Sequence, residues 1–155
     1  MLRVNVQRST IQREIPSWIW HPELLARTET VFTKRFELVG ETDRLRLFLA
    51  VTGEARIELD GEELERLPEQ AGNVARFTRS ERFPETLSAG PHTLSVHVRC
   101  TNPMPIHPVN MYLHERRVGF IAFLEGDGVW LATDTRWAAD DGQAAVVCRL
   151  GEEPY

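Results

Sequence analysis

The sequence predicts an all-β fold, an antiparallel β-sandwich of the jelly-roll type. Apolar and polar residues alternate with a period of two along several segments, the pattern of a strand with one buried face. Turn residues such as Asp60-Gly61 separate these segments about every 8 to 12 residues, as in sandwiches and barrels. Helical periodicity is weak, and only Pro22–Arg27 is a candidate for one or two helical turns.

Length and composition are those of one ordinary globular domain. The chain has 155 residues, of which 42% are hydrophobic and 26% are charged. No linker, repeat or low-complexity segment divides it, so we expect a single domain over residues 1–155. The net charge is −5 with both signs interspersed, which argues against nucleic acid and anionic membranes as partners.

Two features bear on location and redox state. The N-terminal residues show no apolar segment of a signal peptide. The longest apolar run, Val118 to Leu124, is too short to span a bilayer. Both observations favour a cytoplasmic location.

Cys100 and Cys148 are each in phase with apolar neighbours. We therefore expect two buried thiols, with a disulfide between them as the less favoured alternative.

Three segments alternate between an apolar and a polar face, and the third starts near His92. The apolar sets are Leu45, Leu47, Leu49 and Val51; Ala55, Ile57 and Leu59; and Leu94, Val96, Val98 and Cys100. The opposite sets are Arg46, Phe48, Ala50 and Thr52; Glu54, Arg56, Glu58 and Asp60; and Thr93, Ser95, His97 and Arg99. Each segment is expected to be a half-buried strand of an antiparallel sheet, with His92 and His97 on opposite faces.

The remaining strands are predicted from apolar runs and turns. Val118 to Leu124 is continuously apolar, which fits a strand buried on both faces. Glu125 to Gly128 joins it to Val129–Ala132, and Ala144 to Leu150 is expected to form a final strand. Asp60-Gly61 predicts a type I′ hairpin turn, which requires positive φ.

The sequence contains none of the usual catalytic motifs. A glycine-rich phosphate loop, a nucleophile elbow and a His-Glu-x-x-His helix are all absent, and the five histidines lack metal-ligand spacing. No catalytic residue, metal or cofactor is therefore expected. The acidic side chains after Asp60 predict a solvated edge, and Asp134 suits a turn cap better than a calcium ligand. These acidic residues are Glu62, Glu63, Glu65 and Glu69.

Aromatic residues and one loop are the candidates for ligand binding. Trp18, Trp20 and Trp130 are expected in the core, whereas Trp137 follows a polar turn and is equally suited to the core or to stacking on a sugar. The loop from Arg99 to His114 is polar and contains three prolines. Binding residues often lie on such loops, although an ordinary connection is the alternative.

Several motifs resemble, in their order, the N-terminal β-sandwich region of bacterial α-L-rhamnosidases and related glycoside hydrolases. The resemblance covers Trp18 to Trp137 and implies a galactose-binding-domain-like jelly roll. Asp60 and His92 depart from it, since Asn is usual at both positions. The catalytic acids of the family lie in a separate helical barrel domain, so none is carried over to this chain. The motifs are Trp18-Ile19-Trp20, Phe32 to Leu38, Leu45 to Gly61, Leu87 to Leu94, Gly119 to Leu124 and Thr133 to Trp137.

The resemblance implies a non-catalytic accessory domain of a glycoside hydrolase. Such a domain would pack on the catalytic domain of the same polypeptide and could bind a glycan, with no activity expected from this chain alone. The candidate carbohydrate contacts are Arg99, Asn102, His107 and Asn110 for hydrogen bonds and Trp137 for stacking. The alternatives are a purely structural or oligomerisation domain without a ligand and, with least support, a small free-standing enzyme.

Overall fold

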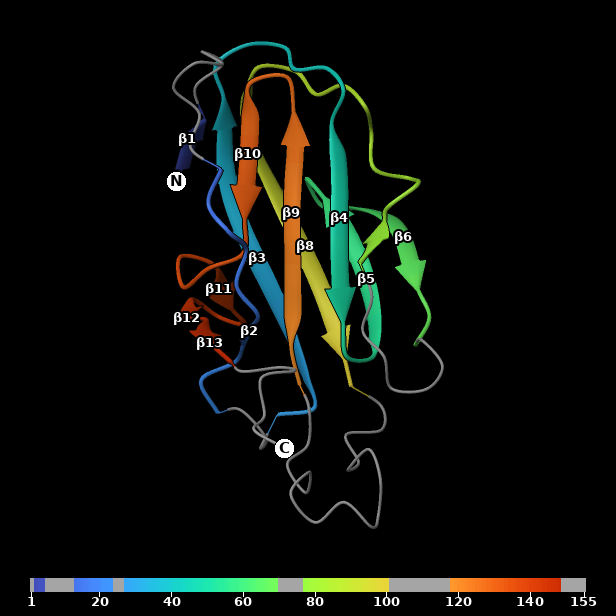
Figure 1. The fold of residues 1–155 in the computed structure, drawn as a ribbon, viewed down its shortest axis with the longest axis vertical. Coiled ribbons are helices and arrows are strands. Elements are labelled where there is room, and N and C mark those ends of the chain that lie inside the picture. Colours follow the sequence, from blue (N-terminus) through green and yellow to red (C-terminus); the bar gives the residue numbers. More distant parts are fainter. Residues whose placement is uncertain (1, 5–12, 24–26, 70–76, 101–117, 149–155) are drawn as a thin grey trace.

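Two sheets face each other in the computed structural model, which confirms the predicted all-β sandwich (Figure 1). The structure describes residues 2–4, 13–23, 27–69, 77–100 and 118–148. Within these ranges every regular element is a strand, and no helix long and apolar enough to cross a membrane occurs there. All strand pairs are antiparallel except β1 with β3.

The first sheet has seven strands and carries the longest pairing of the fold. β3 and β8 pair over ten residues each, from Glu29↔Arg99 to Leu38↔Gly90. The order across the sheet is β12 (Gln143–Ala144), β11 (Ala138–Ala139), β3 (Glu29–Leu38), β8 (Gly90–Arg99), β5 (Glu54–Leu59) and β6 (Glu62–Leu67). β1 (Leu2–Val4) pairs with the end of β3.

The second sheet has six strands and is centred on β9. Its order is β13 (Val146–Val147), β2 (Ile19–Trp20), β9 (Phe120–Gly126), β4 (Arg46–Val51) and β7 (Thr78–Arg79), with β10 (Val129–Ala132) also paired to β9. The side chains of Phe120, Ile121, Ala122 and Leu124 are buried, whereas Phe123 on the outer face is half-buried. The predicted burial on both faces therefore holds for Phe120 to Ala122 and is only partial at Phe123.

The core consists of the inward positions of both sheets, as the alternation predicts. Leu47 and Leu49 of β4, Ile57 of β5 and Leu94 and Val96 of β8 are all at most 1% exposed. Burying an apolar side chain of this size contributes about 1.5–3 kcal/mol relative to leaving it in water. The core is therefore the main stabilising feature of the sandwich.

The hairpin between β5 and β6 adopts the predicted turn. Asp60 has φ 52° and Gly61 has φ 84°, so both central residues have the positive φ that a type I′ turn requires. The Asp60 carboxylate also accepts a hydrogen bond from the backbone N–H of Thr93 at 2.7 Å. The side chain thus ties the turn to the neighbouring strand β8.

The C-terminal strand prediction is wrong. The chain makes two short pairings there instead of one strand: β12 lies in the first sheet and β13 in the second. Between them Ala145 is 1% exposed, and its backbone N–H donates to the carbonyl of Trp137 at 2.9 Å. The chain crosses from one sheet to the other at this residue, which a pattern of alternating side chains does not predict.

The remaining sequence expectations have mixed outcomes. Trp20 is buried as expected, whereas Trp18 and Trp130 are half-buried. Both cysteines are thiols: Cys100 is buried as expected, and Cys148 is half-buried. The candidate helical segment lies partly outside the described residues.

Candidate functional site

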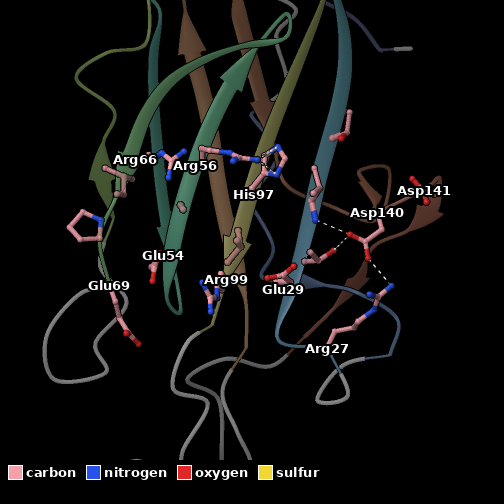
Figure 2. A pocket seen from close by; sticks show the side chains of 17 residues that line it. Arg27, Glu29, Glu54, Arg56, Arg66, Glu69, His97, Arg99, Asp140 and Asp141 are labelled. Atoms are coloured by element: carbon pink, nitrogen blue, oxygen red, sulfur yellow. Dashed lines mark hydrogen bonds and ion pairs between the residues drawn. The ribbon is translucent and has the colours of Figure 1, made fainter.

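A groove of about 1000 Å³ lies over the outer face of the first sheet. Its floor is formed by outward side chains of β3, β8 and β5, as Figure 2 shows. The end of β6 forms one wall, and the turn between β11 and β12 forms the other. The alternation in the sequence placed these polar side chains on the outer face, and the strand pairing brings them together.

Arg56 and His97 line the groove, and both contact Glu58 of β5, which lies beside the groove lining. One guanidinium nitrogen of Arg56 lies 2.8 Å from Nδ1 of His97, and Nε2 of His97 lies 3.2 Å from Oε2 of Glu58. A guanidinium only donates hydrogen bonds, so Nδ1 must accept one in this arrangement. The proton of a neutral ring then resides on Nε2, which faces the Glu58 carboxylate. Figure 2 shows the Arg56 side chain reaching the His97 ring.

The β6 wall is held by an exposed ion pair. Arg66 donates to both carboxylate oxygens of Glu63, with Nε at 3.2 and 3.1 Å and an Nη nitrogen at 3.0 Å. These hydrogen bonds hold the pKa of Glu63 below its usual value, and the same carboxylate raises the pKa of Arg66. Both groups therefore keep their charges over the physiological pH range.

The opposite wall is fixed by Asp140. Its Oδ1 accepts hydrogen bonds from the Thr30 hydroxyl at 3.0 Å and from the Val31 N–H at 2.9 Å, both on β3. Its Oδ2 lies 2.9 Å from an Nη nitrogen of Arg27. Asp140 has φ 54°, a conformation that Asp tolerates better than most residues. The side chain thus ties the turn to the groove floor.

One end of the groove is lined by Arg99. This exposed residue, the last of β8, is the register partner of Glu54 on β5 and of Glu29 on β3. The arginine therefore lies between two acidic positions at the end of the sheet.

In the part of the chain that the structure describes, the groove lining has four arginines, one histidine and five carboxylates, and no Phe, Tyr or Trp. The basic residues are Arg27, Arg56, Arg66, Arg99 and His97, and the acidic residues are Glu29, Glu54, Glu69, Asp140 and Asp141. Among the described residues, no group of three or more His, Cys, Asp or Glu side chains is placed to hold a metal ion.

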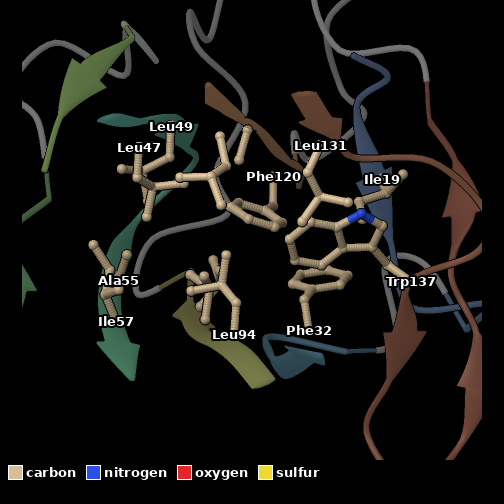
Figure 3. Packing of buried hydrophobic residues seen from close by; sticks show 14 of the residues in the cluster. Ile19, Phe32, Leu47, Leu49, Ala55, Ile57, Leu94, Phe120, Leu131 and Trp137 are labelled. Atoms are coloured by element: carbon tan, nitrogen blue, oxygen red, sulfur yellow. The ribbon is translucent and has the colours of Figure 1, made fainter. Parts of the chain in front are cut away.

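Of the five side chains predicted to contact carbohydrate, the structure places one in the groove and one in the core. Arg99 lines the groove, while Asn102, His107 and Asn110 lie outside the described residues. Trp137 is 1% exposed and packs among core side chains such as Phe32 and Phe120 (Figure 3). Its indole nitrogen donates to the carbonyl of Ala132 at 3.0 Å. Stacking on a sugar needs a free ring face, and this ring is buried in the core.

Arg56, His97 and Arg66 were not predicted from the sequence as site residues. Each is on a polar face or edge, which is also the ordinary position of a solvated residue. The sequence did contain a signal for a polar site, because the outward positions of the two segments Glu54–Asp60 and Thr93–Arg99 carry basic and acidic side chains. Only the register of the strands, with Arg56 opposite His97, shows that they meet.

The outer face of the second sheet carries a row of aromatic rings. Phe123 stacks on Phe48 at 5.0 Å and on Trp130 at 4.9 Å between ring centroids, and Phe77 lies 5.6 Å away at a tilt. The guanidinium of Arg13 lies over Trp130, 5.4 Å from the ring centre. Since the three stacked rings cover one another's faces, this row does not form a flat stacking platform.

The fold and the groove define a β-sandwich domain with a polar site on one outer face. Solved structures with this fold include a GH78 family rhamnosidase of Bacillus sp. GL1, with a TM-score of 0.61 and 18% identity over 92% of this chain and 17% of that chain. The α-L-rhamnosidase of Streptomyces avermitilis, complexed with L-rhamnose, has a TM-score of 0.66 and 18% identity over 90% of this chain and 15% of that chain.

A lectin also shares the fold. The apo Pleurotus ostreatus lectin has a TM-score of 0.55 and 11% identity over 88% of this chain and 45% of that chain. No family model and no curated protein matches the sequence. At these identities the similarities show the fold, and at that level they confirm the resemblance to a sandwich region of α-L-rhamnosidases. The chain spans about a sixth of the two rhamnosidase chains.

Proposed function

We propose that this chain is a non-catalytic accessory domain of a glycoside hydrolase of the α-L-rhamnosidase type, and that its groove holds carbohydrate. The observation that carries the proposal is the coverage of the structural match. The shared fold takes up 90–92% of this chain but 15–17% of two rhamnosidase chains. A unit of this size within a larger enzyme is suited to positioning a substrate or supporting a neighbouring domain.

The composition of the groove supports carbohydrate as its ligand. A sugar hydroxyl both donates and accepts hydrogen bonds, so it is best bound where donors and acceptors alternate. The groove lining offers such a pattern, with guanidinium donors from Arg56 and Arg99 and carboxylate acceptors from Glu29 and Glu54. A lectin with this fold adds support at the level of the fold.

The partner in this proposal is a catalytic domain of the same polypeptide. Two experiments test it: the coding sequence on both sides of the 155 codons is read, and aryl rhamnosides are assayed with this chain alone and with the complete polypeptide. We expect a catalytic domain in the same reading frame and hydrolysis only by the complete polypeptide. Stop codons directly flanking this chain, or full hydrolysis by the chain alone, would refute the accessory function.

A second candidate is a structural or oligomerisation domain without a ligand. The aromatic row on the second sheet favours it, because Phe77 is 48% exposed and lies beside Phe123, which in turn stacks on Phe48 and Trp130. Light scattering of the purified chain and of the Phe77→Ser variant tests this alternative. A dimer that the substitution converts to a monomer, together with no response to sugars, would favour it over carbohydrate binding.

A further inference from the structure

Side chains that line the groove form two rows across the strands of its floor. In each row the residues are register partners on neighbouring strands. Because neighbouring strands lie about 4.8 Å apart, each row repeats a polar side chain at that spacing. The rows are about 7 Å apart, since two residues separate them along each strand. The first row consists of Arg66, Arg56 and His97, and the second of Glu54, Arg99 and Glu29 (Figure 2).

Both rows are accessible to a ligand. Arg66 and all three residues of the second row are exposed. Arg56 and His97 are half-buried, but 37% and 29% of their side-chain surfaces remain in contact with solvent. The first row offers guanidinium donors, and the second offers a carboxylate on each side of a guanidinium. A ligand that carries many hydroxyl groups, lying between the rows, would therefore meet donors on one side and mainly acceptors on the other.

The groove extends across the sheet from one wall to the other. The end of β6 and the β11–β12 turn line its two sides, and β5, β8 and β3 lie between them. From β6 to β11 there are four strand intervals, which together measure about 19 Å. The volume of about 1000 Å³ is at the upper end of the range for pockets that hold drug-sized molecules. A single sugar ring on the floor therefore cannot contact both walls.

We propose that the groove binds an extended glycan of three or more sugar units, laid across the strands between the two rows, in preference to a single terminal sugar. This inference rests on the proposed carbohydrate-binding function and specifies its ligand as a stretch of a glycan chain. The repeat along each row is close to the length of one sugar unit in an extended chain, so successive units meet successive polar side chains.

The chemistry of the lining supports binding that depends on chain length. The lining residues that the structure describes include no Phe, Tyr or Trp, so none of them offers a ring on which one sugar could stack. Hydrogen bonds to exposed side chains each contribute little, because water competes for the same groups. Appreciable affinity then requires contacts summed over several sugar units.

The first test measures affinity against chain length. The complete 155-residue chain is titrated, by calorimetry and NMR, with β-1,4-linked gluco-, manno- and galacto-oligosaccharides of one to six units. In the series that binds, each added unit should raise the affinity about fivefold, the contribution of about one net hydrogen bond. The gain should stop at about four units, when the chain reaches both walls.

Variants locate the bound chain. Arg99→Gln changes the centre of the second row and should weaken every length that binds about fivefold. Arg66→Gln and Asp141→Asn each change one wall, so they should weaken the tetrasaccharide and longer chains about fivefold and leave the disaccharide unchanged. A structural defect would instead weaken all lengths alike. Arg35→Gln, on an exposed residue of β3 outside the groove lining, should bind like the wild type.

Three outcomes would overturn the inference, and they differ in what they leave standing. A monosaccharide that binds as tightly as the hexasaccharide, with binding lost in Arg99→Gln, would keep the groove as a carbohydrate site and reject the extended chain. Affinity that is unchanged in Arg99→Gln, with NMR shifts at Phe48 and Trp130, would keep carbohydrate binding and reject the groove. If no member of the three series shifts any signal at millimolar concentrations, the carbohydrate-binding part of the proposed function fails as well.

Discussion

The Asp60–His92 pair provides a sharp prediction about stability and pH. Nδ1 of His92 lies 2.7 Å from Oδ2 of Asp60, and Nε2 lies 2.8 Å from the carbonyl oxygen of Ser88. Both partners are acceptors, so only the doubly protonated ring satisfies both. Burial of the ring opposes its charge, but the Asp60 and Ser88 contacts outweigh burial and raise the pKa of His92 above its usual 6.5.

The direction of the pH effect follows from that raised pKa. The folded state binds the proton more tightly than the unfolded state, so this contribution is fully present below pH 6.5 and is lost as the pH rises through the folded-state pKa. The substitution Asp60→Asn removes the charge but keeps an oxygen that can accept from the Thr93 N–H, and Asn is also suited to this turn.

The magnitude of the effect follows from the exposure of the two groups. A hydrogen bond to a charged group contributes about 1.5–3 kcal/mol. The His92 side chain is 7% exposed but the Asp60 side chain is 45% exposed, so solvent screening reduces this to about 1 kcal/mol. For a domain of this size, that corresponds to about 2–4 °C in Tm.

The assay is thermal unfolding of wild type and Asp60→Asn from pH 5.5 to 8.5. We expect the variant to be less stable by about 1 kcal/mol at pH 5.5, and the difference to shrink toward zero at pH 8.5, where the neutral ring can accept from the Asn amide. The difference in unfolding free energy between the two proteins cancels the pH dependence that comes from the titratable groups they share. A difference that stays constant across this range would refute the assignment of a charged His92.

Three further predictions concern the packing. Gly53→Ala should destabilise the fold by about 2 kcal/mol or more in urea unfolding, because the new Cβ would lie 2.2 Å from the carbonyl oxygen of Arg99 at φ 148°. Trp137→Phe should lower the unfolding free energy by about 2–3 kcal/mol, through lost volume and the lost bond to Ala132, without changing sugar affinity. Asp140→Ala should cost about 1–3 kcal/mol by removing both bonds to β3, whereas Asp140→Asn, which keeps an acceptor, should cost less than about 1 kcal/mol.

The strands that alternate cleanly were predictable, because burial of one face leaves a period of two in the sequence. Glu54–Leu59 follows the expected pattern, as does Arg46–Val51 except that the outward Ala50 is buried, and the turn at Asp60 follows from the positive φ that its residues tolerate. The two-residue strands β11 to β13 were not predictable, since a pairing so short has no measurable period. Their positions depend on where the chain crosses the sandwich at Ala145.

The groove was harder to predict than the sheets. Arg56 and His97 are 41 residues apart and meet only because β5 and β8 pair in one particular register. Alternation shows that both point outward but does not indicate which residues lie opposite each other. The wall formed by Asp140 belongs to a short turn whose role depends on bonds to a distant strand. Trp137 was misleading in the opposite direction. The polar turn before it suggested an exposed ring, but the ring is buried.

Strand β8 carries two histidines whose hydrogen bonds differ: His92 donates from both ring nitrogens, whereas His97 must accept at Nδ1. The first ring stabilises the fold and the second belongs to the groove, so the two effects can be measured separately. His92 faces two acceptors and is stabilised when doubly protonated, whereas Nδ1 of His97 must accept from Arg56. The groups facing His97 are Arg56 and Glu58 on β5 and, through its charge, Glu63 on β6, while the uncharged Val31 lies opposite on β3.

The two rings should therefore respond differently to substitution. His97→Ala removes the ring that accepts from Arg56 and should weaken sugar binding in the groove, while it leaves the His92 contribution to stability in place. Binding isotherms and unfolding curves of this variant check the expectation. A parallel fall of affinity and stability would show that the substitution acts on the fold as a whole.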